Sequence, residues 1–135
     1  MKKIFLQLLG ILLLTSCSTK QNVLRSNSDK ILGLWSEHWE PDTLEPENSI
    51  NYVDTLYVFK KKNKLFIECT SDTVYRFSEI TFSNDILKFT KENIIDPEER
   101  FYIYYTMKYS EKDKEFKGSI VNSRDQHNSI TFKKQ

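Results

Sequence analysis

The stretch Ile31-Leu32-Gly33-Leu34-Trp35 opens the first convincing strand in this chain of 135 residues. A glycine at this point lets the backbone bend sharply as it enters a sheet. The tryptophan two residues later is large enough to plug one end of a small closed barrel. We therefore interpret Gly33 and Trp35 as a structural barrel plug, with a sheet after them and a tether before them.

After Trp35, apolar and polar side chains alternate with a period of two, and Asn, Asp, Ser and Pro interrupt the alternation. Strand-forming aromatic residues are abundant, with 9 Phe and 7 Tyr, and no helical stripe of any length occurs. The pattern predicts eight strands, at residues 32–40, 52–60, 65–70, 73–82, 86–90, 100–110, 115–121 and 129–133. We predict an all-β, eight-stranded antiparallel up-and-down meander that hides its edges by closing into a barrel, and a β-sandwich is the alternative.

The alternation also predicts which side chains line the interior, because residues two apart on a strand share a face. Trp35, Glu37 and Trp39 share one face of the first strand. A carboxylate that faces a barrel interior is costly unless it is paired or hydrogen-bonded, so Glu37 is the strongest candidate for a ligand-facing group. The alternative is a bulge after Trp35 that turns Glu37 to solvent beside His38. The predicted ligand-binding lining is Glu37, Trp39, Tyr57, Phe77, Phe89, Tyr105 and Tyr109.

The N-terminus has the features of a secretory signal. Met1-Lys2-Lys3 is positively charged, and the apolar run at residues 4–14 is shorter than the roughly 20 residues that span a membrane. Leu-Thr-Ser-Cys follows and ends at Cys17. This order resembles the lipobox of bacterial lipoproteins, in which the cysteine thiol receives a diacylglyceryl group and becomes the new N-terminus. We expect residues 1–16 to be a lipoprotein signal peptide and Cys17 to be lipidated; an ordinary signal peptide with an incidental cysteine is the alternative.

Lipidation of Cys17 has physical consequences for the rest of the chain. Each buried CH₂ of an acyl chain contributes roughly 0.8 kcal/mol, so several chains anchor the protein durably in a membrane. Residues 17–30 then form a flexible polar tether. Ser18 follows the cysteine, and by resemblance to enterobacterial sorting this favours the outer membrane over the inner one. No acidic cluster follows the cysteine, unlike in many surface-exported lipoproteins of the Bacteroides group, so we expect a position facing the periplasm. Cys69 is left without a cysteine partner, and we expect a small buried apolar side chain there.

Gly33-Leu34-Trp35, a long loop and a meander of short strands together resemble the lipocalin-like (calycin) barrels. Small lipid-anchored members are common in Bacteroides-type bacteria, whose Lys-, Asn-, Ile- and Tyr-rich composition this chain shares. The resemblance covers residues 31–135 and implies that Trp35 points into the closed end of the barrel. In lipocalins an arginine near the last strand packs on this tryptophan. Here Arg124 is the only arginine after Arg100, and it falls in a predicted loop.

Composition and motifs argue against several classes of function. The 20 basic and 19 acidic residues nearly balance, which gives no electrostatic case for a nucleic-acid partner. The two histidines, His38 and His127, are too few and too far apart for a typical zinc site. Nucleophile elbows and phosphate-binding glycine loops are absent from the sequence. We therefore expect no metal, no cofactor and no enzymatic activity.

Two connections carry concentrated charge. The loop at residues 41–49 is acidic, and it is a candidate contact surface for a protein partner. Lys60, Lys61, Lys62 and Lys64 form a predicted hairpin tip, interpreted as a charged edge that discourages strand addition or as a contact with anionic lipid heads.

The sequence therefore predicts a membrane-anchored envelope lipoprotein whose barrel binds a small apolar or amphipathic ligand. The alternative is a solid barrel that acts as a protein-interaction module through its loops, as a hydrolase inhibitor or an envelope assembly component.

Overall fold

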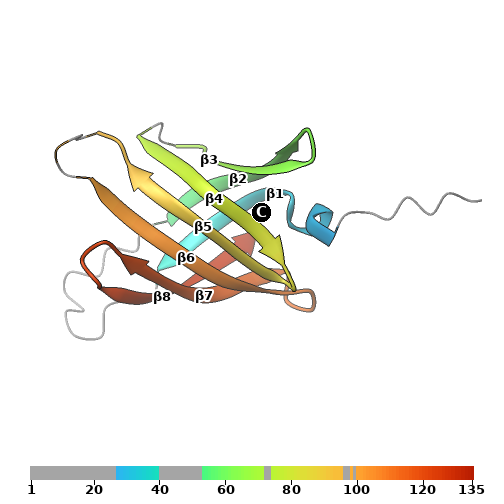
Figure 1. Ribbon diagram of the computed structural model, residues 1–135. Coiled ribbons are helices and arrows are strands. Elements are labelled where there is room, and N and C mark those ends of the chain that lie inside the picture. The colour runs from blue at the N-terminus through green and yellow to red at the C-terminus, as the bar shows by residue number, and fades with distance from the viewer. Residues whose placement is uncertain (1–26, 40–52, 72–73, 96–97, 99) are drawn as a thin grey trace, which may run out of the picture.

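A single antiparallel sheet of eight strands curls round and nearly closes into a barrel in the computed structural model (Figure 1). The structure describes residues 27–39, 53–71, 74–95, 98 and 100–135. The elements are η1 (Asn27–Ile31), β1 (Gly33–Trp39), β2 (Val53–Lys61), β3 (Lys64–Cys69), β4 (Tyr75–Ser83), β5 (Ile86–Asn93), β6 (Phe101–Ser110), β7 (Glu115–Asn122) and β8 (His127–Lys134). The strand order β3-β2-β1-β8-β7-β6-β5-β4 is a meander in which β1 pairs with β8. The predicted all-β meander is confirmed, and the β-sandwich alternative is wrong because one sheet contains all eight strands.

One end of the barrel is covered by η1, and we call it the closed end. Ile31 and Trp35 are fully buried there, and the indole Nε1 of Trp35 donates to the Ile31 carbonyl oxygen at 2.8 Å. The Trp35 ring packs edge-on against Phe116, with centroids 4.9 Å apart. Gly33 has φ +122°, a conformation that side-chain-bearing residues rarely adopt, so the glycine makes the sharp entry into β1 possible.

Residues 27–30, predicted as part of the tether, belong to η1 instead. Ile31 anchors this helix by burying its side chain in the core. Two ion pairs then hold it against the β4–β5 turn and against β2: Lys30 with Asp85, and Asp29 with Lys60. The short polar sequence has no periodic pattern of its own, so the helix depends on these tertiary contacts.

The strand β7 approaches its neighbour β6 unusually closely at Gly118. A Cβ added to Gly118 would lie 2.1 Å from the carbonyl oxygen of Thr106 and 2.7 Å from the Cα of Met107. Both are backbone atoms of β6, so neither can move aside without distorting the sheet.

We expect Gly118→Ala to lower the free energy of unfolding by about 3 kcal/mol, the upper part of the usual range for overpacking, because the methyl group forces β6 and β7 apart. Urea unfolding monitored by circular dichroism measures this. Ser119→Ala, at the exposed neighbouring position, is the control and should change stability by less than about 0.5 kcal/mol. Equal stability of the two variants would mean that β6 and β7 can separate at this point without cost.

Candidate functional site

Three charged side chains lie buried inside the barrel, in the half away from η1. They are Glu37 of β1, Asp54 of β2 and Lys91 of β5, with exposed fractions of 0%, 1% and 2%. The Lys91 ammonium lies 3.3 Å from Glu37 Oε2 and 3.2 Å from Asp54 Oδ2. One lysine therefore bridges two carboxylates from strands on the other side of the barrel. We call these three residues the buried triad.

Glu37 is held by two further donors. Its Oε1 accepts hydrogen bonds from the Tyr105 hydroxyl at 2.5 Å and from the Trp39 indole nitrogen at 2.9 Å. Burial, and then the charge of Glu37, raise the pKa of Tyr105 well above its ordinary value, so the phenol keeps its proton and remains a donor. Glu37 thus faces the interior, and the alternative in which a bulge turned it to solvent is wrong.

Asp54 accepts hydrogen bonds from a residue of β3, from a residue just after β3 and from its own neighbour on β2. Its Oδ1 accepts from the Cys69 thiol at 2.8 Å, the Ser71 hydroxyl at 2.7 Å and the Thr55 backbone N–H at 3.1 Å. Burial, together with the bond to Asp54, raises the pKa of the Cys69 thiol and keeps it protonated. The prediction of a purely apolar role for Cys69 is therefore corrected: the side chain is half-buried and acts as a donor to a buried carboxylate.

Lys91 stays charged in spite of its burial. Desolvation lowers the pKa of Lys91, but the charges of Glu37 and Asp54 outweigh it, and the pKa lies above the ordinary lysine value. The ammonium also lies 4.3 Å from the centre of the Tyr75 ring. Throughout the described residues, no buried side-chain nitrogen or oxygen lacks a hydrogen-bond partner. The buried triad is therefore complete without a ligand.

The predicted lining residues fall into three groups. Five of them come together in the half of the barrel away from η1: Glu37, Trp39, Phe77, Phe89 and Tyr105. The Phe89 and Tyr105 rings stack there with centroids 4.2 Å apart. Tyr109 lies with Trp35 near the closed end, at a centroid distance of 6.1 Å.

Tyr57 corrects the prediction, because it lies on the outer face of β2 with 43% of its surface exposed. Leu56 and Val58 occupy the inward positions on either side of it. The alternation of β2 was therefore assigned to the wrong face, one residue out of phase with the structure.

Sequence reasoning missed Asp54 and Lys91, although a signal for each was present. Alternation from Leu56 and Val58 puts Asp54 on the inward face, and alternation from Leu87 and Phe89 does the same for Lys91. The predicted strand at residues 86–90 ended before Lys91, whereas β5 continues to Asn93.

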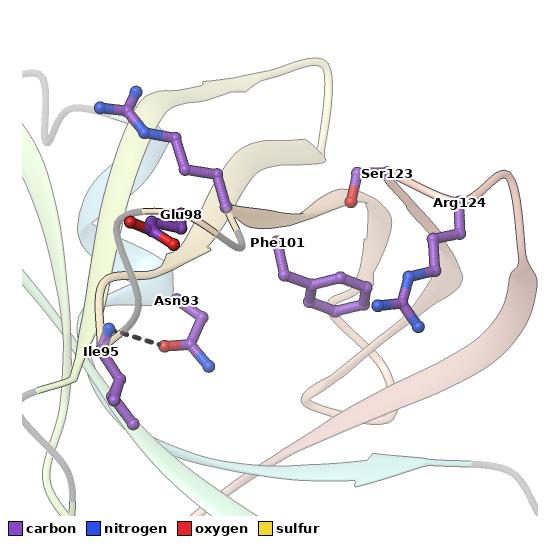
Figure 2. A pocket seen from close by; sticks show the side chains of 7 residues that line it. Asn93, Ile95, Glu98, Phe101, Ser123 and Arg124 are labelled. Carbon is purple, nitrogen blue, oxygen red and sulfur yellow. Dashed lines mark hydrogen bonds between the residues drawn. The ribbon is translucent and has the colours of Figure 1, made fainter.

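A second candidate site is an open pocket of about 490 Å³ at the end of the barrel opposite η1 (Figures 1 and 2). We call this the open end. The pocket lies between the β5–β6 and β7–β8 connections, and its lining is Asn93, Ile95, Glu98, Arg100, Phe101, Ser123 and Arg124. Asn93 pairs with Phe101 across the β5–β6 ladder and follows Lys91 by two residues on the same face. The pocket is therefore the layer directly above the buried triad.

Two donor groups at this pocket have no hydrogen-bond acceptor among the described residues. The Arg124 guanidinium lies 5.7 Å from the centre of the Phe101 ring, and among the described residues no carboxylate is within ion-pair distance of it. Asn93 accepts a hydrogen bond from the Ile95 N–H at 3.0 Å through its Oδ1. Its amide nitrogen has no partner within the described part of the chain. Figure 2 shows Arg124 against the Phe101 ring, with Glu98 on the opposite side of the pocket.

Arg124, the candidate for the arginine that packs on the tryptophan in lipocalins, therefore lies at the open end and not on Trp35. Lys134 of β8 supplies the cation over the Trp35 ring, 5.4 Å from its centre, and it also donates to the Lys30 carbonyl oxygen at 3.2 Å. A cation and the tryptophan thus meet at the closed end, but the cation is a lysine.

Comparisons of the chain with protein-family models, with curated proteins and with solved structures found no match. Among the described residues, no helix is long and apolar enough to cross a bilayer. The same part of the chain holds no group of three or more His, Cys, Asp or Glu side chains arranged to bind a metal ion. Cys17 and the loop at residues 41–49 lie outside the described residues, so their predicted roles stay predictions.

Proposed function

We propose that this chain is a lipid-anchored envelope protein, held at the periplasmic face of the outer membrane by Cys17, that binds a small amphipathic ligand at the open end of its barrel. The observation that supports binding is the open-end pocket, in which donors without an acceptor among the described residues lie beside the Phe101 ring. Its volume of about 490 Å³ lies within the usual range for small-molecule sites.

The chemistry of the lining selects the kind of ligand. The guanidinium of Arg124 and the amide nitrogen of Asn93 are both donors, which suits a carboxylate or another anionic group. Phe101 and Ile95, the latter 66% exposed, offer apolar surface to a short hydrocarbon segment. The ligand class is therefore an apolar chain or ring that carries one anionic group.

The proposed site lies at the open end of the barrel, whereas the site predicted from the sequence lies deeper in the interior, at Glu37. Glu37 was expected to meet the ligand directly, but Lys91, Tyr105 and Trp39 already occupy its oxygens. A ligand that entered the deep interior would have to break these contacts. In our proposal the buried triad instead forms the rigid floor below the pocket.

We expect Arg124→Gln to weaken binding of a fluorescent fatty acid with a short hydrocarbon chain by about tenfold or more, because one charge-assisted hydrogen bond contributes about 1.5–3 kcal/mol. Fluorescence titration of the purified protein measures the dissociation constant. Arg76→Gln is the matched control, since Arg76 is an exposed arginine of β4 outside the pocket and should leave the affinity unchanged. Equal effects of the two substitutions, or none from either, would exclude Arg124 from the site.

Native mass spectrometry of the protein purified from a bacterial periplasm then tests the function itself. A retained mass that is lost in the Arg124→Gln variant supports a carrier of amphipathic molecules and identifies the ligand class. A clean ligand-free mass, even after incubation with lipid extracts, favours the protein-interaction module. In that case the loop at residues 41–49 becomes the segment to delete.

A further inference from the structure

The outer face of the β2–β3 hairpin carries a row of large apolar side chains. Tyr57 and Phe59 stack with centroids 5.2 Å apart, and Phe59 and Phe66 with centroids 5.5 Å apart. Leu34 of β1 pairs with Tyr57 and extends the row. Leu34, Tyr57 and Phe66 are 39%, 43% and 38% exposed. We call these four residues the aromatic strip, and its continuity over three strands distinguishes it from isolated surface apolar residues.

The strip runs toward a turn made of lysines. Lys61 and Lys64 pair directly across the ladder, and Lys62 lies between them in the turn. All three are exposed, and in the described part of the chain none has an ion-pair partner. Like charges directly opposite each other on a ladder are locally unfavourable, so this arrangement does not serve the stability of the hairpin. An anionic surface would remove that repulsion. We call these three residues the lysine tip.

The lysine tip belongs to the closed end of the barrel. Lys60, at the end of β2, forms an ion pair with Asp29 of η1 and so holds the hairpin beside the helix. In Figure 1 the β2–β3 turn and η1 lie at the same end of the molecule, where the described chain begins at Asn27. Further exposed lysines without an ion-pair partner in the described residues lie at this end in the β6–β7 turn and at the end of β8: Lys112 and Lys133.

The acids at the closed end leave this positive charge largely uncompensated. Asp29, Asp85, Glu111 and Glu115 are each already paired with a lysine. Asp113 of the β6–β7 turn accepts a hydrogen bond from the Ser110 hydroxyl and is the exposed acid that offsets Lys112 beside it. Glu68, which faces outward opposite Tyr57, marks the limit of the aromatic strip toward the open end. Apolar rings therefore share one surface patch with lysines that have no ion-pair partner among the described residues, and Glu68 lies at its border.

This combination matches the chemistry of a bilayer interface with anionic lipids. Aromatic rings with an apolar body partition to the headgroup level, and lysines near the surface are attracted by anionic headgroups. We propose that the aromatic strip and the lysine tip dock on an anionic bilayer surface, with the closed end toward the membrane and the open-end pocket away from it. The patch acts without the lipid on Cys17, so the proposal goes beyond membrane anchoring and does not depend on it.

The orientation agrees with the position of the predicted anchor in the sequence. Cys17 precedes Asn27 by ten residues, which reach at most about 36 Å when fully extended. An anchor at this distance from the closed end permits the patch to touch the same membrane. Docking then turns the ligand pocket toward the aqueous phase.

The test uses the chain from residue 17 with Cys17→Ser, which has no lipid and contains every described element between Asn27 and Gln135. Co-sedimentation is measured with vesicles of equal parts phosphatidylglycerol and phosphatidylcholine, and with vesicles of phosphatidylcholine alone. We expect binding to the anionic vesicles that is at least about tenfold tighter and that weakens as salt is added.

Matched variants then locate the contact. Lys61→Glu with Lys64→Glu should weaken binding to anionic vesicles by about tenfold or more, since both lysines belong to the tip. Lys88→Glu with Lys108→Glu makes the same change in net charge on the exposed face of β5 and β6, and it should have a much smaller effect. Circular dichroism of each variant shows whether the barrel is intact.

A second pair tests the apolar part of the patch. Tyr57→Ser should weaken binding several-fold, whereas Tyr104→Ser should not, although Tyr104 on β6 is 47% exposed. The proposal is overturned if the unlipidated chain does not bind anionic vesicles, if it binds both vesicle types equally, or if the β5–β6 variants lose as much binding as the hairpin variants. If the unlipidated chain co-sediments with anionic vesicles as expected but does not bind fatty acid, only the pocket proposal is contradicted.

Discussion

We expect Lys91→Met to lower the free energy of unfolding by about 3–5 kcal/mol, because the substitution leaves two carboxylates buried without a counter-charge. Methionine fills a similar volume, so the loss does not come from a cavity. Lys91 is 2% exposed, and its ammonium is within 3.3 Å of both Glu37 and Asp54. Urea unfolding at neutral pH, followed by circular dichroism, measures the change.

The pH dependence of the same variant gives an independent check. In the wild type, burial raises the pKa of Asp54, but hydrogen bonds from Cys69 and Ser71 and the charge of Lys91 outweigh burial and set it below the ordinary aspartate value. A lowered pKa means that Asp54 stabilises the fold above its unfolded-state pKa, and that this contribution is lost as pH falls through the folded-state pKa.

The raised pKa of Lys91 acts in the opposite direction. Its contribution is fully present below the ordinary lysine pKa and is lost as pH rises through the folded-state pKa. The wild type should therefore lose stability from the triad at both extremes of pH. In Lys91→Met, Asp54 loses the positive charge that helps to lower its pKa and gains by taking up a proton, so the difference between variant and wild type should shrink as the solution becomes acidic.

The control for this experiment is Lys88→Met, which removes an exposed lysine from the same strand. It should change stability by less than about 0.5 kcal/mol at every pH. A loss below about 1 kcal/mol for Lys91→Met, or a loss that does not vary with pH, would contradict strong coupling between Lys91 and the two carboxylates.

Trp35→Ala should lower the free energy of unfolding by about 3–5 kcal/mol, the range for deleting a buried large aromatic side chain. Trp35 is fully buried, and it contacts Tyr109 and Phe116 edge-on. The substitution also removes the hydrogen bond to the Ile31 carbonyl oxygen, so η1 loses its attachment to the core. Calorimetry should show a lower melting temperature, and amide exchange in η1 should accelerate.

Leu34→Ala is the control, because Leu34 is the next residue along β1 and points outward. It should cost less than about 0.5 kcal/mol, because the side chain lies outside the core with 39% of its surface exposed. If Trp35→Ala lost no more than Leu34→Ala, the closed end would not contribute to the core as the geometry requires.

The strands themselves could be read from the sequence, because period-two alternation is a local property. The sixth strand was predicted at residues 100–110 and is observed at Phe101–Ser110, with Ile103, Tyr105, Met107 and Tyr109 all buried. Predictions failed where a local pattern was ambiguous. Leu56 and Tyr57 are adjacent on β2 and both are largely apolar, so either could face the interior. The register with β1 places Leu56 inward.

The candidate sites could be predicted only in part. Glu37 was identified because a carboxylate in an inward position needs a partner, but the sequence does not name that partner. Lys91 follows Glu37 by 54 residues, and Asp54 precedes Lys91 by 37. Such pairs meet only when the sheet curls, so their contact is a property of barrel curvature and strand order.

By itself, the sequence determined the all-β class, the number of strands, the antiparallel meander and the shared face of Trp35, Glu37 and Trp39, since each follows from alternation and turn residues within a few positions; that Glu37 faces inward and not to solvent was decided by the structure. Only the tertiary structure decided the rest: that Lys91 forms ion pairs with both Glu37 and Asp54, that η1 covers one end, and that Arg124 and Phe101 meet at the other. These features depend on groups far apart in the chain. The physical reason is that an unpaired buried charge is costly, so buried charged side chains are paired across the barrel whatever their separation in sequence.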